Sequence, residues 1–160
     1  MLRSAVWQGL VAGAAGTAVM TVAEKIEQRF TGRPDSQVPG AVLARLTGGR
    51  LRTTLLMHFG QGALVGGVRA LMANAGLRGP VASAMFTVVR LSTDQILENA
   101  TGVGAPPQTW PRSELLVDLL HKTVYGFATG AVADALAARR GPGPGQRHAA
   151  ERPGRRSGRE

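Results

Sequence analysis

The chain has 160 residues, enough for one domain, and 44% of them are hydrophobic although only 4% are aromatic. The absence of cysteine excludes disulfides, thiolate metal sites and cysteine nucleophiles. A formal net charge of +9 suits either nucleic acid or anionic lipid as a partner. The 22 glycines are too many for ordinary soluble helices, whereas in membranes small residues let helices approach closely. Composition therefore favours a helical membrane domain.

The first apolar stretch, Ala5–Ala23, contains no charged residue. Its length matches the roughly 20 helical residues that a bilayer requires, and Gly9 and Gly13 provide a small face for packing. A cleaved signal peptide ending at Thr21-Val22-Ala23 is the alternative interpretation. Because the run is long and further apolar stretches follow, we expect a membrane-spanning helix.

A polar connection runs from Glu24 to Thr53 and is interrupted by prolines and glycines. Within it, Val38–Leu46 has the pattern of a short amphipathic helix on the membrane surface, with Arg45 reaching the lipid headgroups.

The second and third apolar stretches are predicted to form an antiparallel helical hairpin. The second covers about residues 54–73, and a short glycine-rich turn separates it from the third, about residues 80–98, which opens with Pro80. The third stretch is charged in its second half. We expect it to span a membrane if Arg90 and Asp94, spaced i, i+4, pair with each other or face the interior.

The fourth apolar stretch covers about residues 115–138 and follows a loop in which Trp110 has the character of an interfacial anchor. From residue 139 onward Gly, Pro and Arg dominate, which predicts a disordered basic tail. The sequence thus predicts an all-α fold: about four transmembrane helices within residues 1–138, and a disordered tail over 139–160.

Antiparallel threading of four spans brings most strongly polar residues to one level. The half of the bundle that faces the first and third loops would collect a cluster of eight residues: Glu24, His58, Arg90, Asp94, Glu98, Asp118, His121 and Lys122. In the other half, Arg69 and Asp134 stand at similar depth and could form an ion pair. Charges in a membrane are costly unless they are paired, so all of these groups should face inward.

The polar cluster has three interpretations. It could be a structural network that fixes helix register, or it could line a proton or solute pathway. It could also bind a metal through His58, His121, Glu24 or Asp118, since Asp118-x-x-His121 places both side chains on one helix face, or bind haem through the two histidines.

A set of motifs resembles a known family. The opening Gly9-x-x-x-Gly13-x-x-Gly16-Thr17-x-x-Met20-Thr21-x-x-Glu24, then His58-x-x-x-Gly62, and finally His121-x-x-Tyr125-Gly126 look like small bacterial membrane proteins of the YagU-like kind. The resemblance covers about residues 5–138. It implies a multi-helix protein of the bacterial inner membrane without an assigned biochemical activity.

The sequence contains no specific catalytic motif, so we expect a non-enzymatic membrane protein without a cofactor. Its expected partners are the bilayer, anionic headgroups near the Arg-rich tail, and a second copy of the chain. The basic tail favours cytoplasmic termini. The alternative is a soluble all-α protein that binds nucleic acid, which Ala5–Ala23 disfavours because it offers no polar face to water.

Overall fold

The computed structural model describes residues 2–50 and 53–152, and over these residues it is all-α with no strand. This confirms the predicted fold class at the level of a helical bundle. The elements are α1 Leu2–Thr31, α2 Val38–Leu46, α3 Thr54–Ala75, α4 Pro80–Thr101, the 3-10 helix η1 Pro107–Thr109, α5 Arg112–Ala138 and α6 Pro144–Ala150. Helix α2 has the bounds that its amphipathic pattern predicts.

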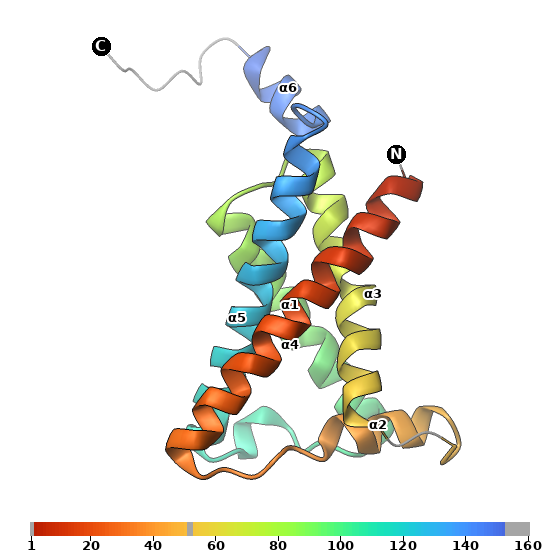
Figure 1. Ribbon diagram of the computed structural model, residues 1–160, viewed down its shortest axis with the longest axis vertical. Helices are drawn as coiled ribbons and strands as arrows, with labels where there is room; N and C mark the ends of the chain where they lie inside the picture. The colour runs from red at the N-terminus through yellow and green to blue at the C-terminus, as the bar shows by residue number, and fades with distance from the viewer. Residues whose placement is uncertain (1, 51–52, 153–160) are drawn as a thin grey trace.

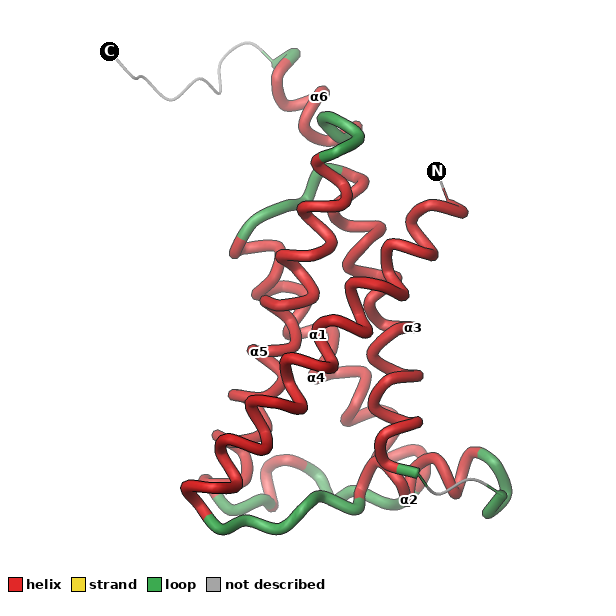
Figure 2. The backbone as a smooth tube through the Cα atoms, in the orientation of Figure 1, coloured by secondary structure: helices red, strands yellow, loops and turns green. Residues whose placement is uncertain are grey.

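The four long helices α1, α3, α4 and α5 form an antiparallel bundle (Figure 1). Helix α1 packs against α3 and α5, and α4 packs against α5 and α3. Both ends of the described chain lie at one end of the bundle, which we call the terminal end. The opposite end, which we call the loop end, carries residues 32–50 with α2 and residues 102–111 with η1 (Figure 2).

Helix α1 continues beyond the apolar stretch, which the sequence predicts to end at Ala23, and stops only at Thr31. No helix-breaking residue occurs before Gly32, whose φ of 70° is a left-handed conformation that suits glycine, and Pro34 follows two residues later. The added turns carry Glu27 toward the loop end, where it contributes to the site described below.

Glycine allows α1 and α3 to touch backbone to backbone. A Cβ atom on Gly66 would come within 2.7 Å of the Gly13 Cα, and one on Gly9 would come within 2.6 Å of the Gly67 nitrogen. A methyl group therefore cannot be added at these positions without separating the two helices. The glycine pairs that the sequence places on these helices thus pack within the chain.

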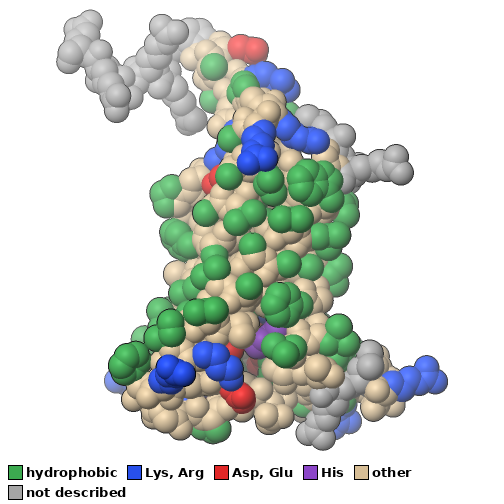
Figure 3. Space-filling model, in the orientation of Figure 1, with side chains coloured by type: hydrophobic (Ala, Val, Ile, Leu, Met, Phe, Trp, Pro, Cys, Tyr) green, Lys and Arg blue, Asp and Glu red, His purple; other side chains and the backbone are tan. Residues whose placement is uncertain are grey.

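Large apolar side chains lie on the surface, while the interior mixes polar side chains with apolar ones such as Ala70 and Phe86. Large apolar side chains are exposed on every long helix, among them Val22, Leu64, Val88 and Leu116. The buried polar and charged side chains are Gln8, Thr17, Arg69, Ser83, Thr87, Arg90, Asp94, His121, Lys122 and Thr129. On the face shown in Figure 3, Lys and Arg side chains gather toward the two ends, with hydrophobic side chains between them.

One helix, Ser4–Thr31, is long and apolar enough to cross a membrane by length and composition, among the residues that the structure describes. In helices α3, α4 and α5 several charged side chains are buried inside the bundle: Arg69, Arg90, Asp94 and Lys122.

The structure contradicts the predicted disorder in one part of the basic tail. Residues 144–150 form α6 where the sequence predicts disorder. The amide of Gly143 donates to Gln146 Oε1 at 2.9 Å and Pro144 opens the helix, so this short segment has its own capping. Helix α6 also contacts α3. The rest of the predicted disordered tail, residues 153–160, lies outside the described residues.

Candidate functional site

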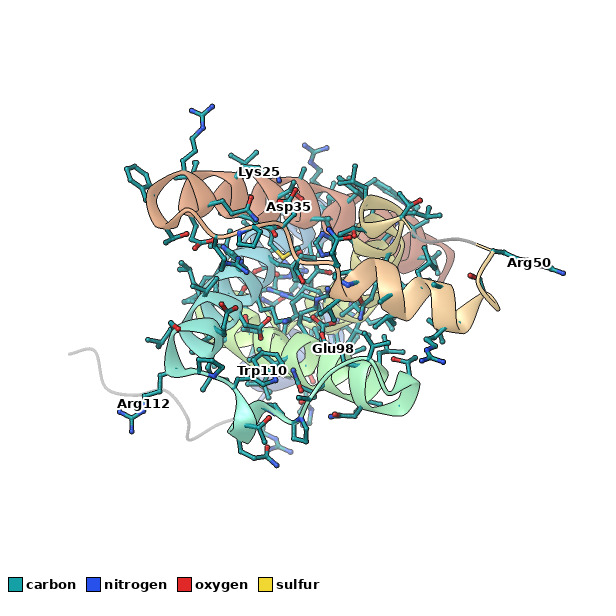
Figure 4. The ribbon with its side chains drawn as sticks, turned by 90° about the horizontal axis from the view of Figure 1, so that it is seen from below. Lys25, Asp35, Arg50, Glu98, Trp110 and Arg112 are labelled. Carbon is teal, nitrogen blue, oxygen red and sulfur yellow. The ribbon has the colours of Figure 1, made fainter. Side chains whose placement is uncertain are left out.

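A partly enclosed cavity of about 370 Å³ lies in the bundle at the loop end. All eight residues of the polar cluster predicted from the sequence line it, and they come from α1, α3, α4 and α5. The first and third loops border it, and Figure 4 views this end of the molecule from below, with Glu98 and Trp110 labelled. The structure thus brings together the side chains that antiparallel threading places at one level.

Asp94 is the centre of the charge network in this cavity. Its carboxylate accepts a 2.6 Å hydrogen bond from Gln61 Nε2 and lies 3.3 Å from both Arg90 Nη1 and Lys122 Nζ. Lys122 also pairs with Asp118, one turn earlier on α5. Two carboxylates and two cations therefore compensate one another inside the bundle, as burial of charge requires.

Arg90 is held on the wall of the cavity by an aromatic ring. Its guanidinium lies 5.0 Å from the centroid of Tyr125, and the Tyr125 hydroxyl donates a 2.6 Å hydrogen bond to the Gly62 carbonyl. Arg90 is 3% exposed, yet its Nε and Nη1 atoms make no hydrogen bond within the described part of the chain. Cation–π contact and the neighbouring Asp94 compensate its charge and leave these N–H groups available.

The two predicted histidines share the cavity. His58 reaches it from α3, and His121 from α5. The Nε2 atom of His121 is buried, lies 3.9 Å from Glu27 Oε2 and has no hydrogen-bond partner among the described residues. The four predicted metal-ligand candidates, His58, His121, Glu24 and Asp118, line the same cavity. Nevertheless, the described residues include no group of three or more His, Asp or Glu that could hold a metal ion.

The rim of the cavity contains residues that sequence reasoning missed. Arg33, in the first loop, lies 3.0 Å from Glu27 Oε2 and 3.8 Å from Glu114 Oε2, so it links the end of α1 to the start of α5. The hydrogen bond from Arg33 lowers the pKa of the Glu27 carboxyl, and a second hydrogen bond from the Thr31 hydroxyl acts in the same direction. The charges of Arg33 and Glu27 are visible in the sequence, but the path of the loop that joins them is not.

The terminal half of the bundle encloses its own buried charge. Arg69 Nη2 lies 2.8 Å from Asp134 Oδ1, which is the pair that the sequence predicts. Arg69 has no exposed surface and donates further hydrogen bonds to the Leu77 carbonyl and the Ser83 hydroxyl. Asp134 Oδ2 accepts the Gly79 amide at 2.8 Å, so this pair also fixes the turn between α3 and α4.

Comparison of the chain with protein-family models, with curated proteins and with solved structures finds no match. The resemblance to YagU-like proteins therefore stays a prediction, and the functional argument depends on the site itself.

Proposed function

We propose that this protein is a multi-pass membrane protein of four spanning helices whose loop end holds a binding vestibule for a small polar solute. The observation that carries the proposal is the distribution of polarity in the bundle: many large apolar side chains are exposed, while several charged side chains are buried. In water such a surface would favour aggregation, whereas in lipid it is the stable arrangement.

Helix lengths agree with this proposal. Helices α3 and α4 have 22 residues each, about 33 Å at 1.5 Å per residue, close to the ~30 Å hydrocarbon core of a bilayer. Three of the four charged residues that lower their mean hydropathy are turned inward and paired: Arg69 with Asp134 of α5, and Arg90 with Asp94. Their side chains therefore face other helices rather than lipid.

The vestibule supports a binding role. Its walls carry buried polar atoms that have no hydrogen-bond partner in the described part of the chain, such as Arg90 Nε and His121 Nε2, and a bound polar molecule would satisfy them. In the proposed membrane arrangement the opening lies at the membrane surface, because the first and third loops border it. If the basic tail keeps the termini in the cytoplasm of a bacterial cell, the vestibule opens on the outer side of the inner membrane.

The membrane assignment is tested by extraction. The full-length chain should remain in the membrane pellet after a carbonate wash and should require detergent for release. Complete release by carbonate would overturn the membrane assignment and would leave the soluble basic alternative.

The vestibule is tested by single cysteines, for which the cysteine-free chain is well suited. Gln61 lines the cavity, whereas the adjacent Gly60 faces open space on the outside of α3 at the same depth. In membrane vesicles, a water-soluble and impermeant thiol reagent should label the Gln61→Cys variant and leave the Gly60→Cys variant unlabelled. Equal labelling of the two variants would contradict a water-filled vestibule. Labelling from one side of the membrane only also gives the orientation.

A further inference from the structure

The cavity walls carry an excess of negative charge. Five carboxylates line the cavity, against three cationic side chains. The carboxylates are those of Glu24, Asp94, Glu98, Glu114 and Asp118, and the cations are Arg33, Arg90 and Lys122. With neutral histidines, the lining has a formal charge of −2, which opposes the strongly basic character of the chain as a whole.

The excess can be assigned to two residues. Asp94 and Asp118 are compensated by Arg90 and Lys122, and Glu114 at the rim faces Arg33. Two carboxylates remain without an ion pair to Lys or Arg in the described part of the chain. They belong to Glu24, whose Oε1 accepts only a 3.3 Å hydrogen bond from Gln28, and to Glu98.

His121 is an independent indication of a ligand. The residue is 9% exposed, it lines the cavity, and its Nε2 atom, 3.9 Å from Glu27 Oε2, has no hydrogen-bond partner among the described residues. A polar ligand in the cavity would give this buried nitrogen a hydrogen-bond partner. The guanidinium of Arg90 does not require a bound anion, because Asp94 and the Tyr125 ring already compensate its charge.

The remaining wall is apolar and includes an aromatic ring. Met20, Leu97 and Val117 line the cavity, and Trp110 stands at its border, with its indole Nε1 donating to the Ala105 carbonyl at 2.8 Å. An inorganic ion gains little from such a surface, whereas the carbon skeleton of an organic cation can pack on it. The described residues also lack a group of His, Asp and Glu that could hold a bare metal ion.

We propose that the vestibule binds a small organic ammonium ion, whose charge is balanced by Glu24 and Glu98 and whose carbon skeleton packs against Trp110 and its apolar neighbours. This inference rests on the proposed function, because the two carboxylates can face a solute only if the cavity is filled with water from one side. The ligand class follows from charge balance and from the mixed lining, and His121 Nε2 offers the ligand a polar contact.

The test uses three probes of the same shape and different charge. Choline is the cation, 3,3-dimethyl-1-butanol replaces its nitrogen with carbon and is neutral, and 3,3-dimethylbutanoate is an anion of similar size. Calorimetric titration of the full-length protein in lipid nanodiscs should show choline binding at least about tenfold tighter than either of the other two, which corresponds to about 1.4 kcal/mol. Equal affinity for choline and the alcohol, tighter binding of the anion, or no binding of choline would overturn the inference.

Substitutions then locate the site. Glu24→Gln and Glu98→Gln should each weaken choline binding by about tenfold or more, whereas Glu151→Gln, the same change at an exposed position beyond the terminal end, should leave it unchanged. Choline binding that neither cavity substitution alters would refute the assignment to these residues. If one variant does not fold, the probe series on the unaltered protein still decides the ligand class. Failure of choline to discriminate, with carbonate resistance and Gln61→Cys labelling intact, would refute this inference and leave the proposed function standing.

Discussion

The two halves of the bundle bury charge in different ways. In the terminal half, Arg69 is fully enclosed, and its pairing with Asp134 is completed by hydrogen bonds to the Leu77 carbonyl and to Ser83. In the loop half, charges surround a cavity of about 370 Å³. Among the described residues, buried polar atoms without a hydrogen-bond partner occur in both halves, such as Arg69 Nε at the terminal end and Arg90 Nε at the loop end, but only the latter residue lines this cavity. The same residue types are thus enclosed at the terminal end and line a cavity at the loop end. The difference lies in how tightly the helices approach.

The removal of an aspartate should show the largest difference in stability between the two halves. Asp134→Ala leaves Arg69 as an uncompensated charge with no exposed surface, so we expect a loss of about 3–5 kcal/mol in the free energy of unfolding. Asp118→Ala removes the same side chain from the same helix, but Lys122 remains paired with Asp94 and lines the cavity. The loss in the free energy of unfolding should therefore stay below about 1 kcal/mol.

The measurement is a chemical unfolding curve in detergent, followed by circular dichroism. Adding Arg69→Met to Asp134→Ala removes the orphaned cation, and we expect it to restore most of the lost stability. Similar losses for the two single alanine variants would show that the halves do not differ in this respect.

A substitution that disturbs the close packing of α1 and α3 in the terminal half should have the next largest effect on stability. Gly66→Ala forces a methyl group against the backbone of Gly13 and should destabilise the protein by about 1–3 kcal/mol. Gly60→Ala lies on the same helix and meets no atom within 4 Å, so it should be neutral or stabilising by up to about 1 kcal/mol. Thermal unfolding midpoints of both variants test this. A Gly66→Ala variant as stable as Gly60→Ala would contradict the backbone contact.

A substitution at the rim of the cavity should have the smallest effect on stability, and this effect should depend on pH. Arg33→Gln removes the partner of Glu27 and should cost about 0.2–1 kcal/mol near neutral pH. Since the folded state lowers the pKa of Glu27, its contribution to stability is present above the ordinary value of 4.5 and is lost as the pH falls through the lower folded value.

Unfolding midpoints of Arg33→Gln and of the unaltered protein should therefore differ at neutral pH and converge in acid. Arg29→Gln, at an exposed position on the same side of the molecule, is the matched control and should show no such convergence. A difference that persists unchanged in acid would exclude the Glu27 pair as its cause.

Depth in the bundle was predictable, whereas most contacts between helices, apart from the Arg69–Asp134 pair, were not. A residue's level follows from its position along a helix and from the direction of the chain, because a helix rises 1.5 Å per residue. This reasoning places Arg69 level with Asp134, and Glu24 level with Asp118. Whether two residues at one level meet depends on the rotation of each helix about its axis, and an apolar pattern on nearly all sides specifies that rotation poorly.

Local sequence determined the elements of this protein. Apolar length, Pro80 at a helix start and the glycine-rich turns were sufficient for the long helices, for α2 and for the all-α class. Only the tertiary structure decided that Gln61 binds Asp94, that Arg33 links α1 to α5, and that the cluster surrounds a cavity. Helix formation depends on neighbours in sequence. These contacts depend instead on the distances between helices, which glycines far apart in the chain determine together.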